Sequence, residues 1–391
     1  MPESLNIAFY TDTFLPAVDG VVTSIINFRE ELRRRGHTVY LFASGDSRTK
    51  AMTKGDRDVF VVRGTKFKKY PQYNLALFPF ISPLKTRNLE IDITHAHTPF
   101  TMGAYSIIYS RLNRIPAVGS FHTLFTNKSV IKEYTTRNRM VTKVIQKYSW
   151  PYAKFFYGKC DSVIAPSDSI RDLLMKKGIS NVSMVPNSVD TKRFNPKVSG
   201  AKIRSRVMRN ERNKLVLYAG RLSKEKKLDV LIKAARTLKN SDIEFIIGGT
   251  GPAESYYRNL VARYRLQSKV RFVGFIDPEL LPGFYAAADV FCIPSTFETQ
   301  GIVSLEAMAT GKPVVGADYL ALGEIIRNGR NGEKFRPGDS RACAAKISKV
   351  INNMSSYKDM LETARSYSIE RTTDQLLDVY KETIEKHGES L

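Results

Sequence analysis

The sequence predicts an α/β protein of two domains, each built around a parallel β-sheet that helices cover on both faces. Short apolar strands alternate with amphipathic helical segments along the chain, which is the rhythm of repeated βαβ units. The 391 residues exceed the size at which a single hydrophobic core keeps growing, so a second core is expected. Residues 188–212 are polar and basic without apolar periodicity, and we interpret them as the connection between the domains.

In the first half, residues 5–10 form the first predicted strand. A loop ending at Gly20 follows, and then an amphipathic helix from about Val21 to Arg35, which Gly36 stops. The further strands predicted in this half are residues 38–43, 59–64, 92–97, 116–121, 161–166 and 182–187. Strands joined by helices in this way are parallel, so their carboxyl ends meet at one edge of the sheet.

The second half repeats the pattern. Its predicted strands are residues 214–220, 243–249, 269–275, 289–294 and 312–317, and the chain from about residue 340 is mostly helical. We therefore expect a Rossmann-like N-terminal domain over residues 1–190 and a Rossmann-like C-terminal domain over residues 191–368. Two such sheets facing each other would create one long cleft, a natural ligand site.

The bulk composition is that of an ordinary soluble globular protein, with 42% hydrophobic and 25% charged residues. No apolar run reaches the ~18 residues of a membrane span, and the first residues lead directly into a strand, so we expect no signal peptide. The three cysteines show no metal or disulfide spacing, which fits a reducing cytosol. The formal net charge of +23 favours anionic partners such as nucleic acid, acidic lipid or phosphorylated substrates.

Two glutamates mark the strongest motif. Glu298 and Glu306 flank Gly301 at the predicted start of a helix. Helix N-terminal amides attract phosphate, whereas carboxylates accept hydrogen bonds from sugar hydroxyls. The pattern predicts that Glu298, in the loop, faces the sugar of a phosphorylated ligand and that Glu306, about a turn inside the helix, reaches a ribose diol. The structural alternative is a pair of solvent-exposed helix acids.

A basic loop, residues 220–227, follows the first strand of the second half. Phosphates bind at such strand ends, and a diphosphate suits both the bidentate guanidinium of Arg221 and the point charge of Lys226. The glycine turn at residues 248–251 follows the next strand and permits a tight bend and a close ligand, with Gly249 as a candidate contact. Such turns are common, so the alternative for each loop is an ordinary βα connection.

The first half offers two further candidate positions. Asp19 and Gly20 lie in the loop after the first strand, just before a helix whose amides could meet a phosphate. His97 and His122 lie at the ends of two other strands, where an imidazole can hydrogen-bond a sugar hydroxyl, and we favour a functional role for both. A lone histidine is more often structural. We assign His37 and His95 to that class.

These motifs occur in order along nearly the whole chain and together resemble the GT4 family of glycosyltransferases, which have the GT-B fold. The resemblance rests on the Glu298–Glu306 spacing, the GRLSKEK loop, the GGTGP turn, the Asp-Gly-Val loop at residue 19 and APSDSIRDLL. It implies two facing Rossmann-like domains with an interdomain cleft, and a final helix, about residues 369–391, that packs back on the first domain. The activity that it implies is the transfer of a hexose from a nucleotide sugar with retention at the anomeric carbon.

The resemblance also implies roles for individual residues. Arg221 and Lys226 would bind the donor diphosphate, and Glu306 the ribose. Glu298 would contact the sugar and the β-phosphate, together with the backbone at Gln300, Gly301 and Ile302. The segment from Phe272 to Gly274 would border the nucleotide base. His122 would contact the donor sugar, and His97 is expected on the acceptor side. Many relatives carry two glycines where this sequence has Asp19 and Gly20.

The mechanism expected from these residues is a front-face displacement. No carboxylate in the loops of the first half stands out as a nucleophile apart from Asp19, which the phosphate loop explains better. The leaving diphosphate would deprotonate the acceptor hydroxyl while Arg221 and Lys226 stabilise its charge, so we expect no cofactor and no metal. Residues 56–58 match the DxD spacing of a metal motif, but they lie in an unsupported basic loop, and we assign no metal to them.

Two segments, residues 63–84 and 128–159, combine basic and aromatic side chains. This combination suits an anionic bilayer surface, at roughly 1 kcal/mol per well-placed Lys or Arg. Within the family, the sequence resembles the diacylglycerol glucosyltransferases and the phosphatidylinositol mannosyltransferases. We expect a lipid acceptor and a cytoplasmic enzyme that binds peripherally at the inner face of the cell membrane. A solvated basic face is the alternative.

The donor and the acceptor stay open. UDP-glucose and GDP-mannose are the leading donors, ahead of UDP-linked N-acetylhexosamine. The alternatives are a glycosyltransferase that acts on a soluble carbohydrate or glycan, an inactive sugar-nucleotide binder and a nucleic-acid-binding protein. The intact set of Arg221, Lys226, Glu298 and Glu306 disfavours an inactive binder. No helix-turn-helix or base-stacking pattern stands out, and we expect no nucleic-acid partner.

Overall fold

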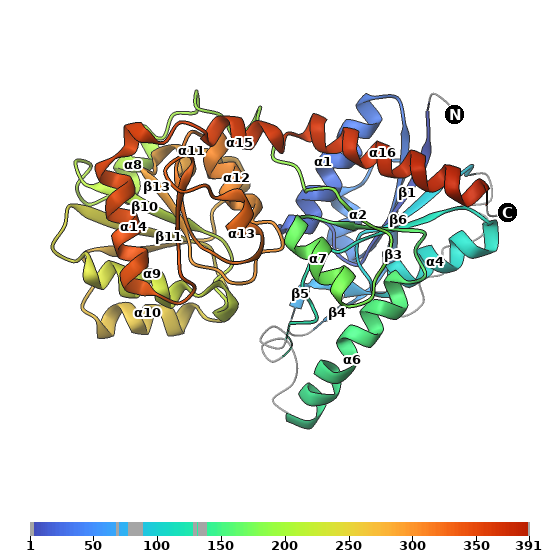
Figure 1. Ribbon diagram of the computed structural model, residues 1–391, viewed down its shortest axis with the longest axis horizontal. Coiled ribbons are helices and arrows are strands. Elements are labelled where there is room, and N and C mark those ends of the chain that lie inside the picture. Colours follow the sequence, from blue (N-terminus) through green and yellow to red (C-terminus); the bar gives the residue numbers. More distant parts are fainter. Residues whose placement is uncertain (1–3, 68–69, 77–88, 128–130, 132–138, 390–391) are drawn as a thin grey trace. The chain divides into compact units, whose positions relative to one another are not determined.

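The computed structural model in Figure 1 describes residues 4–67, 70–76, 89–127, 131 and 139–389. The chain folds as two compact units. Unit 1 comprises Met1–Ser188 together with Ile369–Leu391, and unit 2 comprises Val189–Ser368. Each unit has its own sheet and its own hydrophobic core.

Unit 1 contains a seven-stranded sheet in the order β3-β2-β1-β6-β7-β8-β9, in which all neighbouring strands are parallel. The strands are β1 (Asn6–Thr11), β2 (Thr38–Gly45), β3 (Val59–Arg63), β6 (Ile93–Ala96), β7 (Ala117–Ser120), β8 (Ser162–Ala165) and β9 (Val182–Met184). A separate antiparallel pair is formed by β4 (Thr65–Phe67) and β5 (Tyr70–Leu75). The strand order reverses between β1 and β6, so the loops after these two strands diverge.

The helices of unit 1 cover both faces of its sheet. The unit contains α1 (Gly20–Arg34), α2 (Ser47–Met52), α4 (Thr101–Asn113), α6 (Arg139–Tyr157), α7 (Asp168–Lys176) and α16 (Ile369–Gly388). Ile7 and Phe9 of β1 pack in a core that includes α1 and α16. Ala8 and Tyr10 point the opposite way, into a second core with Met102 of α4. This alternation is the two-residue period expected of a strand buried on both faces.

α16 belongs to unit 1 although it follows unit 2 in the sequence. It lies beside α1 (Figure 1, red and blue) and buries Leu376 and Tyr380 completely. The Tyr380 hydroxyl lies 2.6 Å from Nδ1 of His95, and the hydroxyls of Thr383 and Ser162 lie 2.7 Å apart. Apolar burial and polar contacts therefore both hold this helix on the sheet of unit 1.

Unit 2 contains a six-stranded parallel sheet in the order β12-β11-β10-β13-β14-β15. Its strands are β10 (Lys214–Ala219), β11 (Ile243–Gly248), β12 (Val270–Gly274), β13 (Val290–Ile293), β14 (Val314–Ala317) and β15 (Gly332–Phe335). Its helices are α8 (Ala201–Val207), η1 (Lys224–Lys226), α9 (Leu228–Thr237), α10 (Glu254–Arg263), η2 (Pro278–Leu280), α11 (Leu281–Ala287), α12 (Ile302–Ala309), α13 (Leu320–Ile325), α14 (Ser340–Asn352), η3 (Met354–Ser356) and α15 (Met360–Ser366). Both sheets are parallel and helix-covered, as the sequence predicts.

Two elements of unit 2 differ from the sequence pattern. The segment interpreted as a connection, residues 188–212, contains α8, whose Ile203 and Val207 pack in the core of unit 2. Two apolar residues in so short a helix give too little periodicity to be recognised. The apolar pattern does not indicate β15, because this strand carries Glu333. The Glu333 carboxylate is fully buried, and Lys346 and Lys349 neutralise it at 2.6 and 2.7 Å.

Across the described parts of the chain, no helix combines the length and the apolar character needed to span a membrane.

Candidate functional site

The candidate donor residues of unit 2 lie at or after the ends of four strands that are neighbours in the sheet, namely β12, β11, β10 and β13. Because these strands are parallel, their carboxyl ends share one edge, and the loops that carry the candidates leave the sheet there. The strand order reverses between β10 and β13. In open α/β sheets such a switch point is where ligands bind.

Lys226 and Glu298 lie on the two loops that flank this switch point. The Lys226 ammonium donates a hydrogen bond to Oε1 of Glu298 at 2.7 Å. The exposed fractions of the two side chains, 23% and 11%, show that water is partly excluded from the ion pair, so the attraction exceeds that of a surface pair. A cation and a carboxylate that the sequence assigns to one ligand are thus in direct contact.

Arg221 begins the loop that ends with Lys226. The buried Tyr218 hydroxyl donates a hydrogen bond to the Arg221 carbonyl at 2.9 Å, which ties the loop to β10. The Arg221 side chain is half-buried. Glu225, directly before Lys226, is buried and accepts a hydrogen bond from the Ser223 hydroxyl. The loop that carries the two candidate cations is therefore anchored from within.

Two of the candidate glycines have backbone conformations that residues with a side chain rarely adopt. Gly249 has a φ of 122°, and a Cβ atom there would lie 1.9 Å from the Gly220 carbonyl oxygen, because the loops after β10 and β11 touch. Gly301 has a φ of 83°, and its Cβ would lie 2.9 Å from Leu322. Glycine permits both the strained φ and the close approach.

α12 begins at Ile302, directly after Gly301, as the sequence predicts. Gln300 and Glu306 are both buried, with exposed fractions of 2% and 8%. The Tyr285 hydroxyl of α11 donates a hydrogen bond to Oε2 of Glu306 at 2.7 Å. Glu306 is therefore a buried and oriented carboxylate rather than a solvent-exposed helix acid.

Phe272 and Gly274 lie at the end of β12, beside the glycine turn. The Gly274 carbonyl accepts a hydrogen bond from the Gly249 amide at 2.7 Å. The Arg258 guanidinium stands over the Phe272 ring, 4.7 Å from its centroid, so one face of the ring already contacts a cation. The expected base-binding segment is thus joined to the rest of the candidate site of unit 2.

Three histidines of unit 1 cluster at the ends of β6 and β7. Nδ1 of His97 lies 3.1 Å from Nε2 of His122, and the two rings are nearly parallel, at an interplanar angle of 10°. The His95 ring stacks on His97 with centroids 4.1 Å apart. His95 contacts the hydroxyls of Tyr380 and Ser120 at 2.6 and 2.7 Å, which is a structural environment.

Burial lowers the pKa of all three histidines. For His95 and His97 the pKa falls well below the usual value, and a second contribution comes from neighbouring imidazoles. For His122 burial lowers the pKa to about 4, against the opposing effect of a hydrogen bond to Asn187. All three rings are neutral at pH 7. A neutral His122 suits a hydrogen bond to a hydroxyl and does not supply a positive charge.

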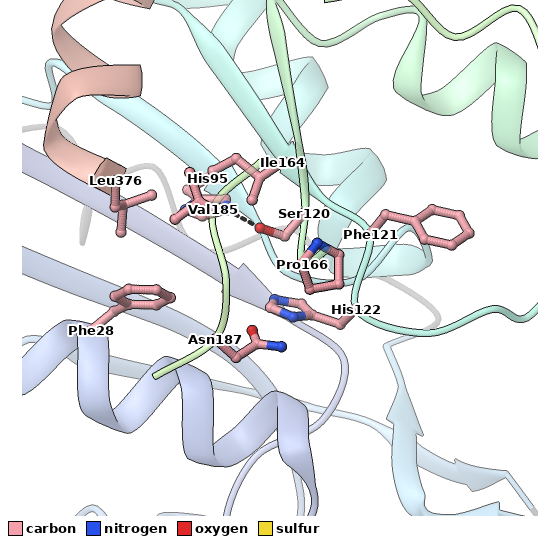
Figure 2. Close-up of a pocket in the computed structure, with 10 residues that line it drawn as sticks. All are labelled: Phe28, His95, Ser120, Phe121, His122, Ile164, Pro166, Val185, Asn187 and Leu376. Carbon is pink, nitrogen blue, oxygen red and sulfur yellow. Dashed lines mark hydrogen bonds between the residues drawn. The ribbon is translucent and has the colours of Figure 1, made fainter. Parts of the chain in front are cut away.

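The cavity lined by His95 and His122 has a volume of about 10 Å³, roughly that of one water molecule. In Figure 2 the side chains of His122 and Asn187 turn toward each other, and a hydrogen bond joins His95 to Ser120. A sugar does not fit there. The cavity belongs to the packing of the histidine cluster, and the contact of His122 with a donor sugar stays a prediction.

Asp19 has a structural role in addition to the phosphate contact that the sequence predicts. Its carboxylate caps α1 by accepting hydrogen bonds from the amides of Val21 and Val22, both at 2.9 Å. Two of the helix amides that the sequence predicts to meet a phosphate are therefore already bonded to an anion. A phosphate contact of Asp19 and Gly20 stays a prediction, and it would require the carboxylate to give up these amides.

The DxD spacing of residues 56–58 has a structural explanation. Asp56 forms an ion pair with Arg29 at 2.6 Å, and Asp58 lies 3.6 Å from Arg33. Both acids thus bind arginines of α1. Within the described residues, no group of three or more His, Cys, Asp or Glu side chains could hold a metal ion.

The basic and aromatic segments are described in part. Residues 68–69, 77–88, 128–130 and 132–138 lie outside the described residues. α6 is described, and it extends away from the sheet of unit 1 (Figure 1, green). One side of α6 carries exposed apolar residues at helical spacing, which we call the α6 stripe. It consists of Met140, Val141, Val144, Ile145, Tyr148, Tyr152 and Phe155.

Two family models together match most of the chain. The model described as Glycosyltransferase Family 4 matches residues 18–193, and the model described as Glycosyl transferases group 1 matches residues 200–367. The chain belongs to glycosyltransferase family 4. The family consists of retaining enzymes that use nucleotide sugars. The predicted family and enzyme class are thereby confirmed.

This GT4 chain is similar in sequence to two proteins whose names refer to sugars. An alpha-monoglucosyldiacylglycerol synthase from Streptococcus pneumoniae is 29% identical over 326 residues, which is 81% of this chain and 72% of the relative. A GDP-mannose-dependent alpha-mannosyltransferase from Corynebacterium glutamicum is 26% identical over 392 residues, which is 97% of this chain and 89% of the relative.

Solved structures agree with the fold. HepE from Anabaena, in complex with UDP, has a TM-score of 0.75 at 21% identity and covers 97% of this chain and 100% of its own. Sucrose-phosphate synthase from Thermosynechococcus elongatus has a TM-score of 0.77 at 21% identity and covers 97% and 98%. The predicted GT-B fold class of the GT4 chain is confirmed.

The sequence alone does not indicate the contacts of three residues near the candidate GT4 site. Tyr285 lies in an apolar helix and reads as a core residue, so nothing in the sequence indicates where its hydroxyl points. Arg193 lies in the segment interpreted as a connection, yet its charge acts on Glu306. Glu225 reads as one more charge of a basic loop, although it is buried. Only the tertiary structure reveals these contacts.

Proposed function

We propose that this GT4 glycosyltransferase transfers a hexose from UDP-glucose or GDP-mannose to a hydroxyl group of a membrane lipid. The contact between Lys226 and Glu298 at the switch point of unit 2 carries the donor part of this proposal. Relatives named for a glucosyldiacylglycerol product and for GDP-mannose, at 29% and 26% identity, support the choice of donors and of a lipid acceptor.

In the proposed donor complex, the diphosphate takes the place of Glu298 as the partner of Lys226. Arg221 adds a guanidinium, which can bind two phosphate oxygens at once. Glu298, released from the ion pair, accepts hydrogen bonds from the sugar hydroxyls, and Glu306 accepts them from the ribose. The further donor contacts proposed are Gly249, Phe272, Gly274, Gln300, Gly301 and Ile302.

The proposed reaction keeps the anomeric configuration by attack from the side that the leaving group occupies. The bond between the anomeric carbon and the diphosphate oxygen breaks, and the acceptor oxygen bonds to the same face. The acceptor proton passes to the departing diphosphate. Arg221 and Lys226 stabilise the negative charge that develops on that diphosphate, and such preorganised electrostatic contacts are commonly the largest catalytic contribution.

The proposed membrane contact is the α6 stripe. Met140 and Phe155 at its two ends are 75% and 66% exposed. Lys143, Lys147 and Lys154 are exposed in a row that borders the stripe on the helix surface. Apolar side chains flanked by lysines match the boundary between acyl chains and anionic headgroups. The net charge of +23 adds long-range attraction to such a surface.

Nucleotide release tests the donor and the acceptor together. The protein would be incubated with UDP-glucose, GDP-mannose or UDP-N-acetylglucosamine, with and without vesicles of phosphatidylglycerol and diacylglycerol. We expect one of the first two donors to give release that depends on the vesicles. Release that requires a soluble carbohydrate instead, with no response to vesicles, would contradict the lipid acceptor.

Co-sedimentation tests the bilayer contact separately. We expect the protein to sediment with phosphatidylglycerol vesicles at low salt, and we expect the double variant Val144→Glu/Phe155→Glu to remain in solution. Met52→Glu serves as the control, because the 56% exposure of Met52 lies between that of Val144, 50%, and that of Phe155, 66%, but Met52 lies on α2. Equal sedimentation of all three proteins would rule out the α6 stripe as the contact.

A further inference from the structure

Tyr285 and Glu306 form a buried polar pair at the candidate site of unit 2. Tyr285 is fully buried and Glu306 is 8% exposed. The tyrosine hydroxyl is a single donor, and it bonds Oε2 of the carboxylate at 2.7 Å. No described residue is seen to donate to the other oxygen, Oε1. One oxygen of Glu306 is thus fixed by the protein, and the second stays available to a ligand.

The tyrosine ring is itself held in place by packing. Tyr285 contacts Phe194 and Phe291 edge-on, with ring centroids 5.8 and 5.4 Å apart. All three rings belong to the same buried cluster of unit 2. Edge-on contacts of this kind restrict ring orientation. The hydroxyl therefore reaches Glu306 from a rigid base, and a phenylalanine at this position would keep the packing and lose only the hydrogen bond.

The charge of Glu306 depends on this pair. Burial raises the pKa of the Glu306 carboxyl, whereas the Tyr285 hydrogen bond and the positive charge of Arg193 lower it. Removing the hydroxyl would raise the pKa further and would let the carboxylate rotate. Both changes weaken the ability of Glu306 to accept two hydrogen bonds from neighbouring hydroxyls, because a protonated and mobile carboxyl is a poorer acceptor.

We propose that Tyr285 is a positioning residue that makes the site selective for nucleotides with an intact ribose diol, by fixing the carboxylate of Glu306. The inference rests on the proposed function, in which Glu306 binds the ribose. It adds a specificity residue that lies outside the sequence motif and does not itself touch the ligand. Its effect is therefore confined to ligands that carry the 2′- and 3′-hydroxyls.

The test compares UDP and GDP with their 2′,3′-dideoxy analogues by isothermal titration calorimetry. We expect the wild type to bind the diol form at least tenfold more tightly than its dideoxy analogue. Tyr285→Phe should weaken binding of the diol form by about that factor and leave the dideoxy analogue unchanged. Its affinity for the diol form should also begin to fall at a higher pH than in the wild type as the solution is acidified.

Tyr357→Phe is the matched control. The Tyr357 hydroxyl is buried and donates to Oε1 of Glu333 at 3.1 Å, so the variant removes the same kind of hydrogen bond elsewhere in unit 2. We expect it to leave the affinities of both ligand forms unchanged. A circular dichroism spectrum and a thermal unfolding curve for each variant would verify folding.

The outcomes separate this inference from the proposed function. If Tyr285→Phe weakens diol and dideoxy ligands equally, or weakens neither, the positioning role is wrong while the ribose contact of Glu306 stands. If the wild type binds both forms of the nucleotide equally, the assignment of Glu306 to the ribose fails and the role of Tyr285 fails with it.

Discussion

Lys226 and Glu298 form one ion pair, and its two members have separate roles in the proposed function. Each side chain is partly shielded from water, and each satisfies the other at 2.7 Å. Leaving either charge unpaired in such a place costs free energy. In the proposed function, the donor diphosphate replaces Glu298 as the partner of Lys226, and Glu298 then accepts hydrogen bonds from the sugar hydroxyls. The ion pair therefore holds both side chains at the switch point, and in the proposed function a ligand can replace it.

The first prediction concerns Lys226→Ala. Losing one electrostatic donor to a developing charge costs on the order of 3 kcal/mol, or about a hundredfold in rate. We expect kcat to fall by at least that factor while the protein stays folded. Lys224→Ala is the control, because Lys224 lies in the same turn but stands over the Tyr256 ring. A folded Lys226→Ala enzyme with near-normal turnover would refute the assignment.

The second prediction concerns the histidine cluster. The folded-state pKa of His122, about 4, lies below its ordinary value of 6.5, so the unfolded chain binds more protons. The stability from His122 is complete above pH 6.5 and is lost as the pH falls from about 6.5 toward 4. Between pH 7 and pH 5.5 the loss is about 1 kcal/mol from this residue alone.

Urea unfolding followed by tryptophan fluorescence measures this loss, because the single tryptophan, Trp150, lies in unit 1. We expect His122→Asn to lose about 1 kcal/mol less than the wild type over the same pH interval. If the free energy of unfolding depended on pH in the same way in both proteins, His122 would bind a proton as readily in the folded state as in the unfolded state.

At this scale the sequence indicates which residue types gather but not how they pair. Strand ends predict that Lys226 and Glu298 share an edge, because parallel strands place their loops together. Their direct contact spans 72 positions, and the contact of His97 with His122 spans 25. Such contacts depend on side-chain directions that only the tertiary packing sets. The capping role of Asp19 is predictable from the local sequence, since aspartate directly before a helix is a favoured N-cap.

Among the elements, α12 depends most on a single backbone conformation. Its first residue follows Gly301, whose φ is 83°. The third prediction is that Gly301→Ala destabilises unit 2 by more than Gly338→Ala and also reduces turnover at least tenfold. The two glycines share nearly the same φ, at 83° and 82°, but a Cβ on Gly338 meets no atom within 4 Å. Gly338→Ala therefore isolates the cost of the left-handed backbone, about 1 to 2 kcal/mol.

Thermal unfolding and nucleotide release would be measured for both glycine variants. Identical shifts in melting temperature would show that the contact with Leu322 costs nothing, and unchanged turnover would remove the α12 terminus from the candidate site.

The elements that the sequence predicts well are those with long apolar runs. β10 and β11 lie within the predicted ranges because nearly every position in them is buried. The sequence pattern indicates neither α8 nor β15, for different reasons: α8 is short and basic, and β15 carries a charge in the core. A buried Glu333 between two lysines breaks the apolar pattern while obeying the rule that buried charges are paired.

At the scale of the whole molecule, α16 completes unit 1. Leu376, Leu377, Val379 and Tyr380 are buried in its core. Each such side chain contributes roughly 1.5 to 3 kcal/mol, so together they are comparable with the entire stability of a domain. The fourth prediction is that a chain ending at Ser368 loses the cooperative unfolding transition of unit 1.

Trp150 fluorescence reports on that transition, and a chain ending at Gly388 is the control, because it keeps all of α16. We expect the control to unfold like the full chain. A cooperative transition in the shorter protein, at an unchanged urea midpoint, would show that unit 1 is stable without its last helix.

The placement of α16 has a consequence for biosynthesis. The ribosome delivers strands β1 to β9 first, then every element of unit 2, and only afterwards the helix that covers α1. Unit 2 can close its core while the older half of the chain still has an apolar face open to solvent. Unit 2 can therefore finish folding before unit 1, although translation of unit 1 begins first. A nascent chain stalled inside unit 2 would expose this apolar surface, to which chaperones bind.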